Sequence, residues 1–240
     1  MAPRPLDPKP KAVFFDLDDT LCDYAAAREA RLRRAFTLAP DGGIRSREPI
    51  DLDCMIAESI RMHPHGADHF AELFARFGIA DAGEAQAAAD WYRKNRFHNL
   101  RLLPEVETVF LRVREAVSRD DPRAARPIGI VTNGPTEVQH AKLELLGIDR
   151  LVDFVLVSEE FGVAKPDPAI FHEALRLAGV RPQEAVFVGD SVEFDMAGAQ
   201  AASIPTVWLN RQQQAWTNSG PPPTREIRSL AELPQLLGAT

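Results

Sequence analysis

Residues 12–20 read AVFFDLDDT, and this stretch decides the fold of the chain. The apolar run Ala12–Phe15 predicts a buried strand, and three carboxylates follow it at once, those of Asp16, Asp18 and Asp19. Carboxylates this close repel one another unless a cation, a shared proton or water offsets the repulsion. The carboxyl end of a strand is also where open α/β sheets bind ligands. An acidic turn after an edge strand is the alternative, and this stretch alone does not decide between the two.

Four more short apolar runs predict further strands of the same kind. They are Ile128–Val131, Phe154–Val157, Ala185–Val188 and Thr206–Leu209. None alternates strictly between apolar and polar residues, which is typical of strands buried on both faces of a parallel sheet. A small edge strand at Glu226–Ile227 and a closing helix at Leu230–Leu237 are also expected.

Helical patterns lie between these strands. In Thr136–Leu146 the apolar residues Val138, Ala141 and Leu145 recur at helical spacing, and Gly147 follows as a C-cap. Two further helices are predicted at Pro168–Ala178 and Ser191–Ala202. The alternation of strand and helix predicts an α/β fold with a doubly wound, Rossmann-like parallel sheet.

The segment 23–103 interrupts this alternation, because it contains no convincing strand and is rich in Ala, Arg, Glu and Leu. Four amphipathic helices are predicted within it, at Arg28–Leu38, Leu52–Arg61, Asp68–Phe77 and Gly83–Asn95. We therefore expect a catalytic core formed by residues 1–22 and 104–240 and an inserted helical cap domain formed by residues 23–103. The cap is expected to act as a lid over the carboxyl edge of the sheet.

The composition narrows the classes of partner. The 240 residues carry a formal net charge of −7, so there is no basic field to attract a nucleic-acid polymer or an anionic membrane. No apolar run approaches the roughly 18 residues of a membrane span, and the proline-rich start resembles no secretory signal.

The two cysteines, Cys22 and Cys54, are too few for a disulfide framework, which favours a reduced cytoplasmic protein. Cys22 lies near the acidic cluster, so a reactive thiol is an alternative role for it. The oligomeric state is not indicated.

Polar residues follow the predicted strands wherever they end. The sequence Thr132-Asn133-Gly134 follows the second, Ser158-Glu159-Glu160 the third and Gly189-Asp190-Ser191 the fourth, with Asp195 one helical turn further on. In a parallel sheet these positions share one edge. Hard oxygen ligands beside backbone N–H groups indicate a divalent-cation site next to a phosphate site.

Four segments in this order resemble the motifs of the haloacid dehalogenase-like (HAD) hydrolase superfamily. They are Asp16–Thr20, Thr132–Gly134, Lys165-Pro166 and Gly189–Asp195. The resemblance spans nearly all of the chain outside the helical segment, whose position resembles the helical (C1-type) cap of one subclass. The second half is also similar to pyrimidine 5′-nucleotidases and N-acylneuraminate-9-phosphatases.

The resemblance implies a role for each motif residue. Asp16 is expected to be the nucleophile and Asp18 the general acid and then the general base. Thr132 and Asn133 are expected to hold phosphoryl oxygens through a hydroxyl and backbone N–H groups, and Lys165 to neutralise the nucleophile and the phosphate. Mg²⁺ is the expected cofactor, with ligands from Asp16, the backbone carbonyl of Asp18, and Asp190; Asp195 is either a further ligand or a partner of the ligands. Asp19 is a turn residue without a chemical role.

These roles predict a Mg²⁺-dependent phosphatase that hydrolyses a small phosphomonoester through an aspartyl-phosphate intermediate. A nucleoside 5′-monophosphate or a sugar phosphate is the expected substrate. The alternatives are a phosphotransferase or phosphomutase of the same superfamily and a catalytically idle scaffold that acts as a binding protein. Dehalogenation is disfavoured, because the dehalogenases of the superfamily lack the second carboxylate that Asp18 supplies here.

Two features of the predicted cap leave their roles open. His63, His65 and His69 lie within seven residues, which suits either a zinc site or ordinary turn and cap chemistry. The segment Trp91–His98 mixes aromatic and cationic residues, so it either grips a base or an anionic group, or packs its aromatics inside while its cations face water.

Overall fold

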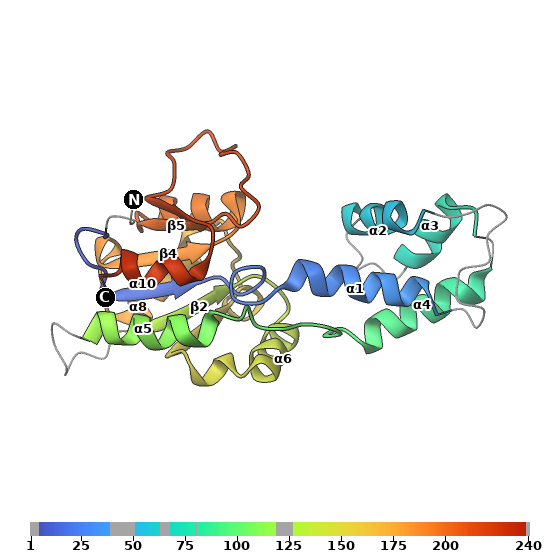
Figure 1. Cartoon of the computed structure of the whole chain (residues 1–240), viewed down its shortest axis with the longest axis horizontal. Coiled ribbons are helices and arrows are strands. Elements are labelled where there is room, and N and C mark those ends of the chain that lie inside the picture. The colour runs from blue at the N-terminus through green and yellow to red at the C-terminus, as the bar shows by residue number, and fades with distance from the viewer. Residues whose placement is uncertain (1–4, 39–50, 63–67, 80, 119–126, 239–240) are drawn as a thin grey trace. The chain divides into compact units, whose positions relative to one another are not determined.

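The computed structural model describes residues 5–38, 51–62, 68–79, 81–118 and 127–238. The chain divides into two compact units, one formed by Met1–Asp23 with Leu102–Thr240 and the other by Tyr24–Arg101 (Figure 1). In the described part of the chain, no helix combines the length and the apolar character that a membrane crossing requires.

The first unit is built on a six-stranded sheet in which every pair of neighbouring strands is parallel. Its strands are β1 (Ala12–Phe15), β2 (Ile128–Thr132), β3 (Phe154–Val157), β4 (Ala185–Gly189), β5 (Thr206–Leu209) and β6 (Arg225–Ile227). Their order is β3-β2-β1-β4-β5-β6, which confirms the predicted doubly wound sheet. The chain reverses its direction across the sheet between β1 and β4, and such a reversal is where α/β folds place ligands.

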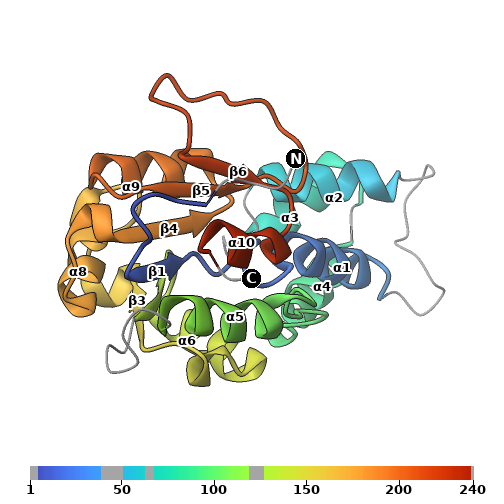
Figure 2. The ribbon, with the colours of Figure 1, turned by 60° about the vertical axis from the view of Figure 1, so that its left-hand side comes forward.

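Helices cover both faces of this sheet (Figures 1 and 2). Phe14 and Phe187 face α8 (Pro168–Ala178), where the rings of Phe171 and Phe187 meet edge to face at 5.0 Å between centroids. Phe15 faces the opposite way and meets Phe110 at 5.0 Å. Because successive residues of a strand point to opposite faces, the fully apolar strand β1 contributes to both layers of the core.

The remaining helices of the first unit are mostly short. They are α5 (Val106–Ser118), α6 (Thr136–Leu146), α7 (Ser158–Phe161), α9 (Ala197–Ala201) and α10 (Leu233–Leu236), with 3₁₀ turns at Ile148–Arg150, Pro182–Glu184 and Leu230–Glu232. The predicted bounds of α6 and α8 agree with the structure. Gly147 ends α6 with a φ of 67°, a left-handed conformation that glycine adopts without strain.

Three elements of the first unit differ from the prediction. In the closing helix expected at Leu230–Leu237, Leu230–Glu232 is a 3₁₀ turn and only Leu233–Leu236 is α-helical. The sequence analysis assigned nothing to α5, although its buried residues Val106, Val109, Phe110 and Val113 follow a helical period. The single helix expected over Ser191–Ala202 is instead a π-helical turn, η3 (Val192–Met196), followed by α9. The wide turn appears in the bond from the N–H of Met196 to the carbonyl of Ser191, five residues back, at 3.0 Å.

The second unit, Tyr24–Arg101, has helices joined by turns and no strand among its described residues. It contains α1 (Tyr24–Phe36), α2 (Leu52–Arg61), α3 (His69–Arg76) and α4 (Ala82–Lys94). The four helices enclose an apolar core of their own, in which the Phe36 ring contacts those of Phe70 and Phe74. The bounds of α2 agree with the prediction, whereas α1 begins four residues earlier than Arg28.

We expect Phe14→Ala to lower the free energy of unfolding by about 3–5 kcal/mol, because it empties a fully buried position on the central strand. Urea denaturation followed by circular dichroism measures this change. Leu111→Ala is the control, since Leu111 is 64% exposed on α5 and its loss should cost less than about 0.5 kcal/mol. Equal effects of the two substitutions would contradict the assigned core.

Candidate active site

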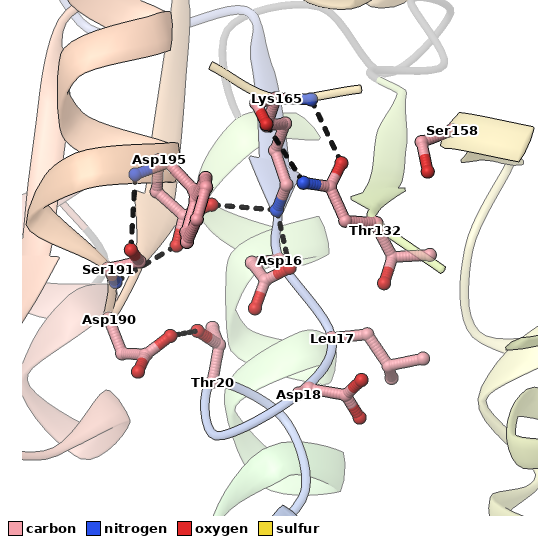
Figure 3. Close-up of polar contacts among 12 residues, drawn as sticks. Asp16, Leu17, Asp18, Thr20, Thr132, Ser158, Lys165, Asp190, Ser191 and Asp195 are labelled. Carbon is pink, nitrogen blue, oxygen red and sulfur yellow. Dashed lines mark hydrogen bonds and ion pairs between the residues drawn. The ribbon is translucent and has the colours of Figure 1, made fainter. Parts of the chain in front are cut away.

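The carboxyl ends of the parallel strands bring the predicted site residues together. Asp16 follows β1, Thr132 ends β2, Ser158 follows β3 and Asp190 follows β4. Figure 3 shows their side chains around Lys165, which reaches in from the loop between α7 and α8. The site therefore lies beside the reversal point of the sheet.

Lys165 is held by two carboxylates at the centre of this group. Its Nζ lies 2.5 Å from Asp16 Oδ1 and 2.7 Å from Asp195 Oδ1, and the residue is only 4% exposed. Burial by itself lowers the pKa of the ammonium, but the two carboxylates outweigh it, so the pKa of Lys165 is raised above its ordinary value. Lys165 is therefore a fixed positive charge against the predicted nucleophile.

Asn133 fixes the backbone of Lys165. Its Oδ1 accepts a hydrogen bond from the N–H of Lys165 at 2.9 Å, and its Nδ2 donates one to the carbonyl of Lys165 at 2.9 Å. This reciprocal pair uses the Asn133 side chain to position the lysine. The Asn133 side chain is therefore engaged with Lys165, and the predicted contact with a phosphoryl oxygen falls to its backbone N–H.

Asp195 links Lys165 to the loop after β4. Its second oxygen, Oδ2, accepts a hydrogen bond from the N–H of Ser191 at 3.0 Å, and the residue is 1% exposed. A Cβ on Gly189 would lie 2.4 Å from the same oxygen, so glycine is what allows Asp195 to come this close. With both oxygens bonded to the protein, Asp195 suits the role of a partner that positions the ligands better than that of a ligand.

Asp190 stands on the opposite side of Asp16 from Thr132. Thr20 donates a hydrogen bond to its Oδ1 at 3.3 Å, and Trp208 Nε1 donates to its backbone carbonyl at 2.8 Å. Burial raises the pKa of Asp190 to about 7, and the charge of Asp195 adds to the shift. Among the residues that the structure describes, no basic side chain forms an ion pair with this carboxyl.

The charge of the cluster fits a divalent cation. Asp16, Asp190 and Asp195 each offer an oxygen, and these atoms lie within 4.8 Å of one another. Lys165 pairs with two of these carboxylates, those of Asp16 and Asp195, so when all three are ionised these four described residues carry two negative charges in excess. Burial, together with Asp195 and Asp190, accordingly raises the pKa of Asp16 well above its ordinary value despite the opposing effect of Lys165. A hard ion such as Mg²⁺ suits this set of oxygens and this charge.

Asp18 lies outside this cluster and has a lysine of its own. Figure 3 shows its side chain pointing away from Asp190 and Asp195. Lys142 Nζ lies 2.6 Å from Asp18 Oδ2 and 2.8 Å from its Oδ1. The two motif carboxylates are thus paired with different cations, which matches different chemical roles. The carboxylate of Asp18 is not among the three that converge, and a ligand role rests on its backbone carbonyl alone.

Sequence reasoning missed Lys142 and its neighbour Gln139. Both are buried on α6, whereas Leu145, which was expected on the apolar face of this helix, is 56% exposed. Gln139 Nε2 donates to the hydroxyl oxygen of Thr132 at 2.5 Å and contacts Asp18 Oδ2 at 3.3 Å. The carboxylate of Asp18 makes burial of a lysine tolerable, and a helical period cannot reveal a partner 124 residues away. The one local signal was the three-residue spacing of Gln139 and Lys142, which places them on the same face of a helix.

Comparison with known proteins agrees with this geometry. A sequence model of the haloacid dehalogenase-like hydrolase family matches residues 10–203. The chain belongs to this family. It is 36% identical over 207 residues to the glyceraldehyde 3-phosphate phosphatase of Methanopyrus kandleri, with 84% of each chain covered. It is also 28% identical over 241 residues to the N-acylneuraminate-9-phosphatase of Homo sapiens, which covers 95% of this chain and 93% of that one.

A solved structure shows the same fold. The HAD-hydrolase YfnB of Bacillus subtilis superposes with a TM-score of 0.70 at 23% sequence identity, covering 95% of this chain and 99% of that one. The predicted HAD family and the predicted enzyme class, a phosphatase, are therefore confirmed. The roles of individual residues remain predictions.

The surroundings of Cys22 bear on its alternative role as a reactive thiol. The thiol is fully buried, and its Sγ contacts Asp18 Oδ1 at 3.7 Å as a hydrogen-bond donor. Burial and then the negative charge of Asp18 raise the pKa of Cys22 well above its ordinary value. A thiol that keeps its proton is a poor nucleophile, so Cys22 is a structural residue of the site.

The open features of the helical unit are partly settled. His63 and His65 lie outside the described residues. His69 is buried, and its Nε2 lies 2.8 Å from Ser59 Oγ, so it is part of the core of this unit. In Trp91–His98 the ring of Tyr92 is buried, whereas the cations at 93, 94 and 96 are exposed, which favours packing as the role of this segment.

The charge of the cluster makes a prediction for Mg²⁺ binding. Without metal, Asp190 keeps its proton up to about pH 7 in the folded state, whereas it ionises near pH 4 in the unfolded chain. The folded state binds the extra proton across this window, so the contribution of Asp190 to the free energy of unfolding decreases as the pH rises. A cation requires the ionised carboxylate, so Mg²⁺ should raise the melting temperature more at about pH 8 than at about pH 5.5. Differential scanning calorimetry measures both shifts.

Asp190→Asn is the matched variant for this experiment. It should remove most of the Mg²⁺-dependent shift at both pH values, while Asp149→Asn, an exposed position on the same unit, should keep it. An unchanged shift in Asp190→Asn would contradict the assignment of this cluster to Mg²⁺.

Proposed function

We propose that the protein is a Mg²⁺-dependent phosphatase that transfers the phosphoryl group of a small phosphomonoester to Asp16 and then to water. The observation that carries the proposal is the pairing of Asp16 with a buried lysine, at a place where the carboxylates of Asp190 and Asp195 also converge. A carboxylate fixed in this way attacks phosphorus without needing a base of its own.

The first step forms a bond between an oxygen of Asp16 and phosphorus, and it breaks the bond between phosphorus and the leaving oxygen. Asp18 must enter this step in its protonated form, and it gives that proton to the leaving oxygen. In this proposal Lys165 offsets the negative charge of the phosphoryl group, and the Thr132 hydroxyl and the Asn133 N–H donate hydrogen bonds to its oxygens. Asp16, the Asp18 carbonyl and Asp190 would hold Mg²⁺, which would supply further positive charge to this group when bound.

The second step hydrolyses the bond between Asp16 and the phosphoryl group. Water attacks phosphorus, Asp18 takes a proton from that water, and the bond between Asp16 and phosphorus breaks. Inorganic phosphate leaves, and Asp16 is a carboxylate again. The separate partners of Asp16 and Asp18, Lys165 and Lys142, support this division between a nucleophile and a proton carrier.

We also propose a small phosphorylated metabolite as the substrate, with a sugar phosphate favoured over a nucleoside 5′-monophosphate. The support comes from the two relatives named above, a glyceraldehyde 3-phosphate phosphatase and an N-acylneuraminate-9-phosphatase, because neither name states a nucleotide as the substrate. In this proposal the helical unit, Tyr24–Arg101, is the cap that selects the substrate and excludes water from the reaction.

The test is hydrolysis of p-nitrophenyl phosphate and of a panel of sugar phosphates and nucleotides in the presence of Mg²⁺. Asp16→Asn should lower kcat by about four orders of magnitude or more, because it removes the nucleophile. Asp19→Asn is the matched control, because Asp19 has a φ of 61° that asparagine also tolerates and no assigned role in the reaction. Chelation by EDTA should abolish turnover, and added Mg²⁺ should restore it.

Two results decide against the proposal. Turnover that survives Asp16→Asn would assign the chemistry to another residue. Product that forms only when an acceptor sugar is supplied would assign the protein to the phosphotransferases or phosphomutases. No turnover of any phosphoester by the native chain would leave the idle scaffold as the better account.

A further inference from the structure

Two polar side chains of α6 hold the carboxylate of Asp18 in place. Lys142 Nζ contacts both of its oxygens, at 2.8 and 2.6 Å, and Gln139 Nε2 contacts Oδ2 at 3.3 Å. The side chain of Lys142 is 4% exposed, whereas that of Asp18 is 25% exposed. The carboxylate therefore has a buried anchor on one side and access to solvent on the other.

The anchor is separate from the machinery around Asp16. Lys165 serves Asp16 and Asp195, and Lys142 serves Asp18, which points to the other side (Figure 3). Gln139 joins the anchor to the phosphate side of the site, because the same Nε2 donates to the hydroxyl oxygen of Thr132 at 2.5 Å. One amide thus contacts both the proton carrier and a phosphate-binding hydroxyl.

The position of Asp18 needs such an anchor. The residue follows the end of β1, and the next residue, Asp19, adopts a φ of 61°, so the backbone turns immediately after it. A side chain with a proton to deliver must stay within hydrogen-bond distance of the reacting oxygen. Burying an ammonium also costs free energy unless a carboxylate pairs with it, so Lys142 and Asp18 depend on each other.

We propose that Lys142 is a positioning residue for the reaction, which fixes the carboxylate of Asp18 for proton transfer, and that Gln139 links this carboxylate to Thr132. The proposal rests on the proposed function above and adds to it a residue outside the four motifs. Lys142 exchanges no proton with the substrate in this account. It acts only through Asp18.

The leaving group of the substrate decides which of the two steps should be slowed by loss of Lys142. An alkyl phosphate needs a proton on its leaving oxygen, so loss of Lys142 should slow the first step. The p-nitrophenolate ion leaves without a proton, so with p-nitrophenyl phosphate the loss should fall on the second step, in which Asp18 takes a proton from water. Lys142→Met should then release one equivalent of p-nitrophenol in a burst before a slow steady state.

The decisive experiment is a double-mutant cycle on kcat with p-nitrophenyl phosphate. Lys142→Met should lower kcat by about 10- to 100-fold without raising KM. In the Asp18→Asn background the same substitution should change kcat by less than about twofold, because its target is already lost. Lys11→Met is the matched control: Lys11 pairs with Glu184 at 2.7 Å on the surface of the same unit, and kcat should not change.

A second readout follows the contact itself and requires no turnover. Lys142→Met should lower the melting temperature of the native chain, since it strands the Asp18 carboxylate, and should lower it less or raise it in the Asp18→Asn background. Lys142→Arg, which keeps the charge on a differently shaped group, covers the case in which Lys142→Met does not fold. Its melting temperature should stay near that of the native chain while kcat falls.

The outcomes separate the two proposals. Equal losses of kcat in the native and Asp18→Asn backgrounds, or no loss at all, would overturn the positioning role while leaving the phosphatase intact. Additive changes in melting temperature would also overturn it, because the two side chains would then not be coupled. Absence of turnover by the native chain would overturn the proposed function, and the positioning role would fall with it.

Discussion

The structure of the site depends on one buried ion-pair system, in which Lys165 lies between Asp16 and Asp195. Burial of the Lys165 ammonium costs free energy, and the two carboxylates that contact it offset this cost. The ammonium in turn offsets only part of the cost of burying the carboxylates. Burial raises the pKa values of Asp190 and Asp16, and the excess of negative charge in the cluster adds to both shifts. The same excess is what makes the cluster a place for a divalent cation.

The fold supplies every part of this system from a different segment. Because β1 and β4 are parallel neighbours, Asp16 and Asp190 emerge at the same edge. The π-helical turn after β4 and the absence of a side chain at Gly189 let Asp195 reach Lys165. The side chain of Asn133, which follows β2, then forms two hydrogen bonds with the backbone of that lysine. A different strand order would separate these groups, so the chemistry of the site depends on the topology of the sheet.

Much of this arrangement was predictable from local sequence. Strand β1 is a continuous apolar run, and α6 and α8 end at glycines, so their bounds agree with the prediction. The motif residues were predictable because each follows a strand. Lys142 and Gln139 were not, because their burial depends on a carboxylate far along the chain and not on a local period. The π turn was also missed, since the bond between Asp195 and Lys165 joins residues 30 positions apart in the chain and leaves no local pattern.

The most direct test of the central claim is to detect the phosphoryl group on Asp16 itself. The chain is mixed with p-nitrophenyl phosphate and Mg²⁺, quenched in acid within the first turnover, digested and analysed by mass spectrometry. Asp18→Asn is included because it should slow hydrolysis of the intermediate. The account predicts the mass of one phosphoryl group on the peptide that contains Asp16, and none in Asp16→Asn. Rapid turnover with no phosphorylated Asp16 in either the native chain or Asp18→Asn would contradict it.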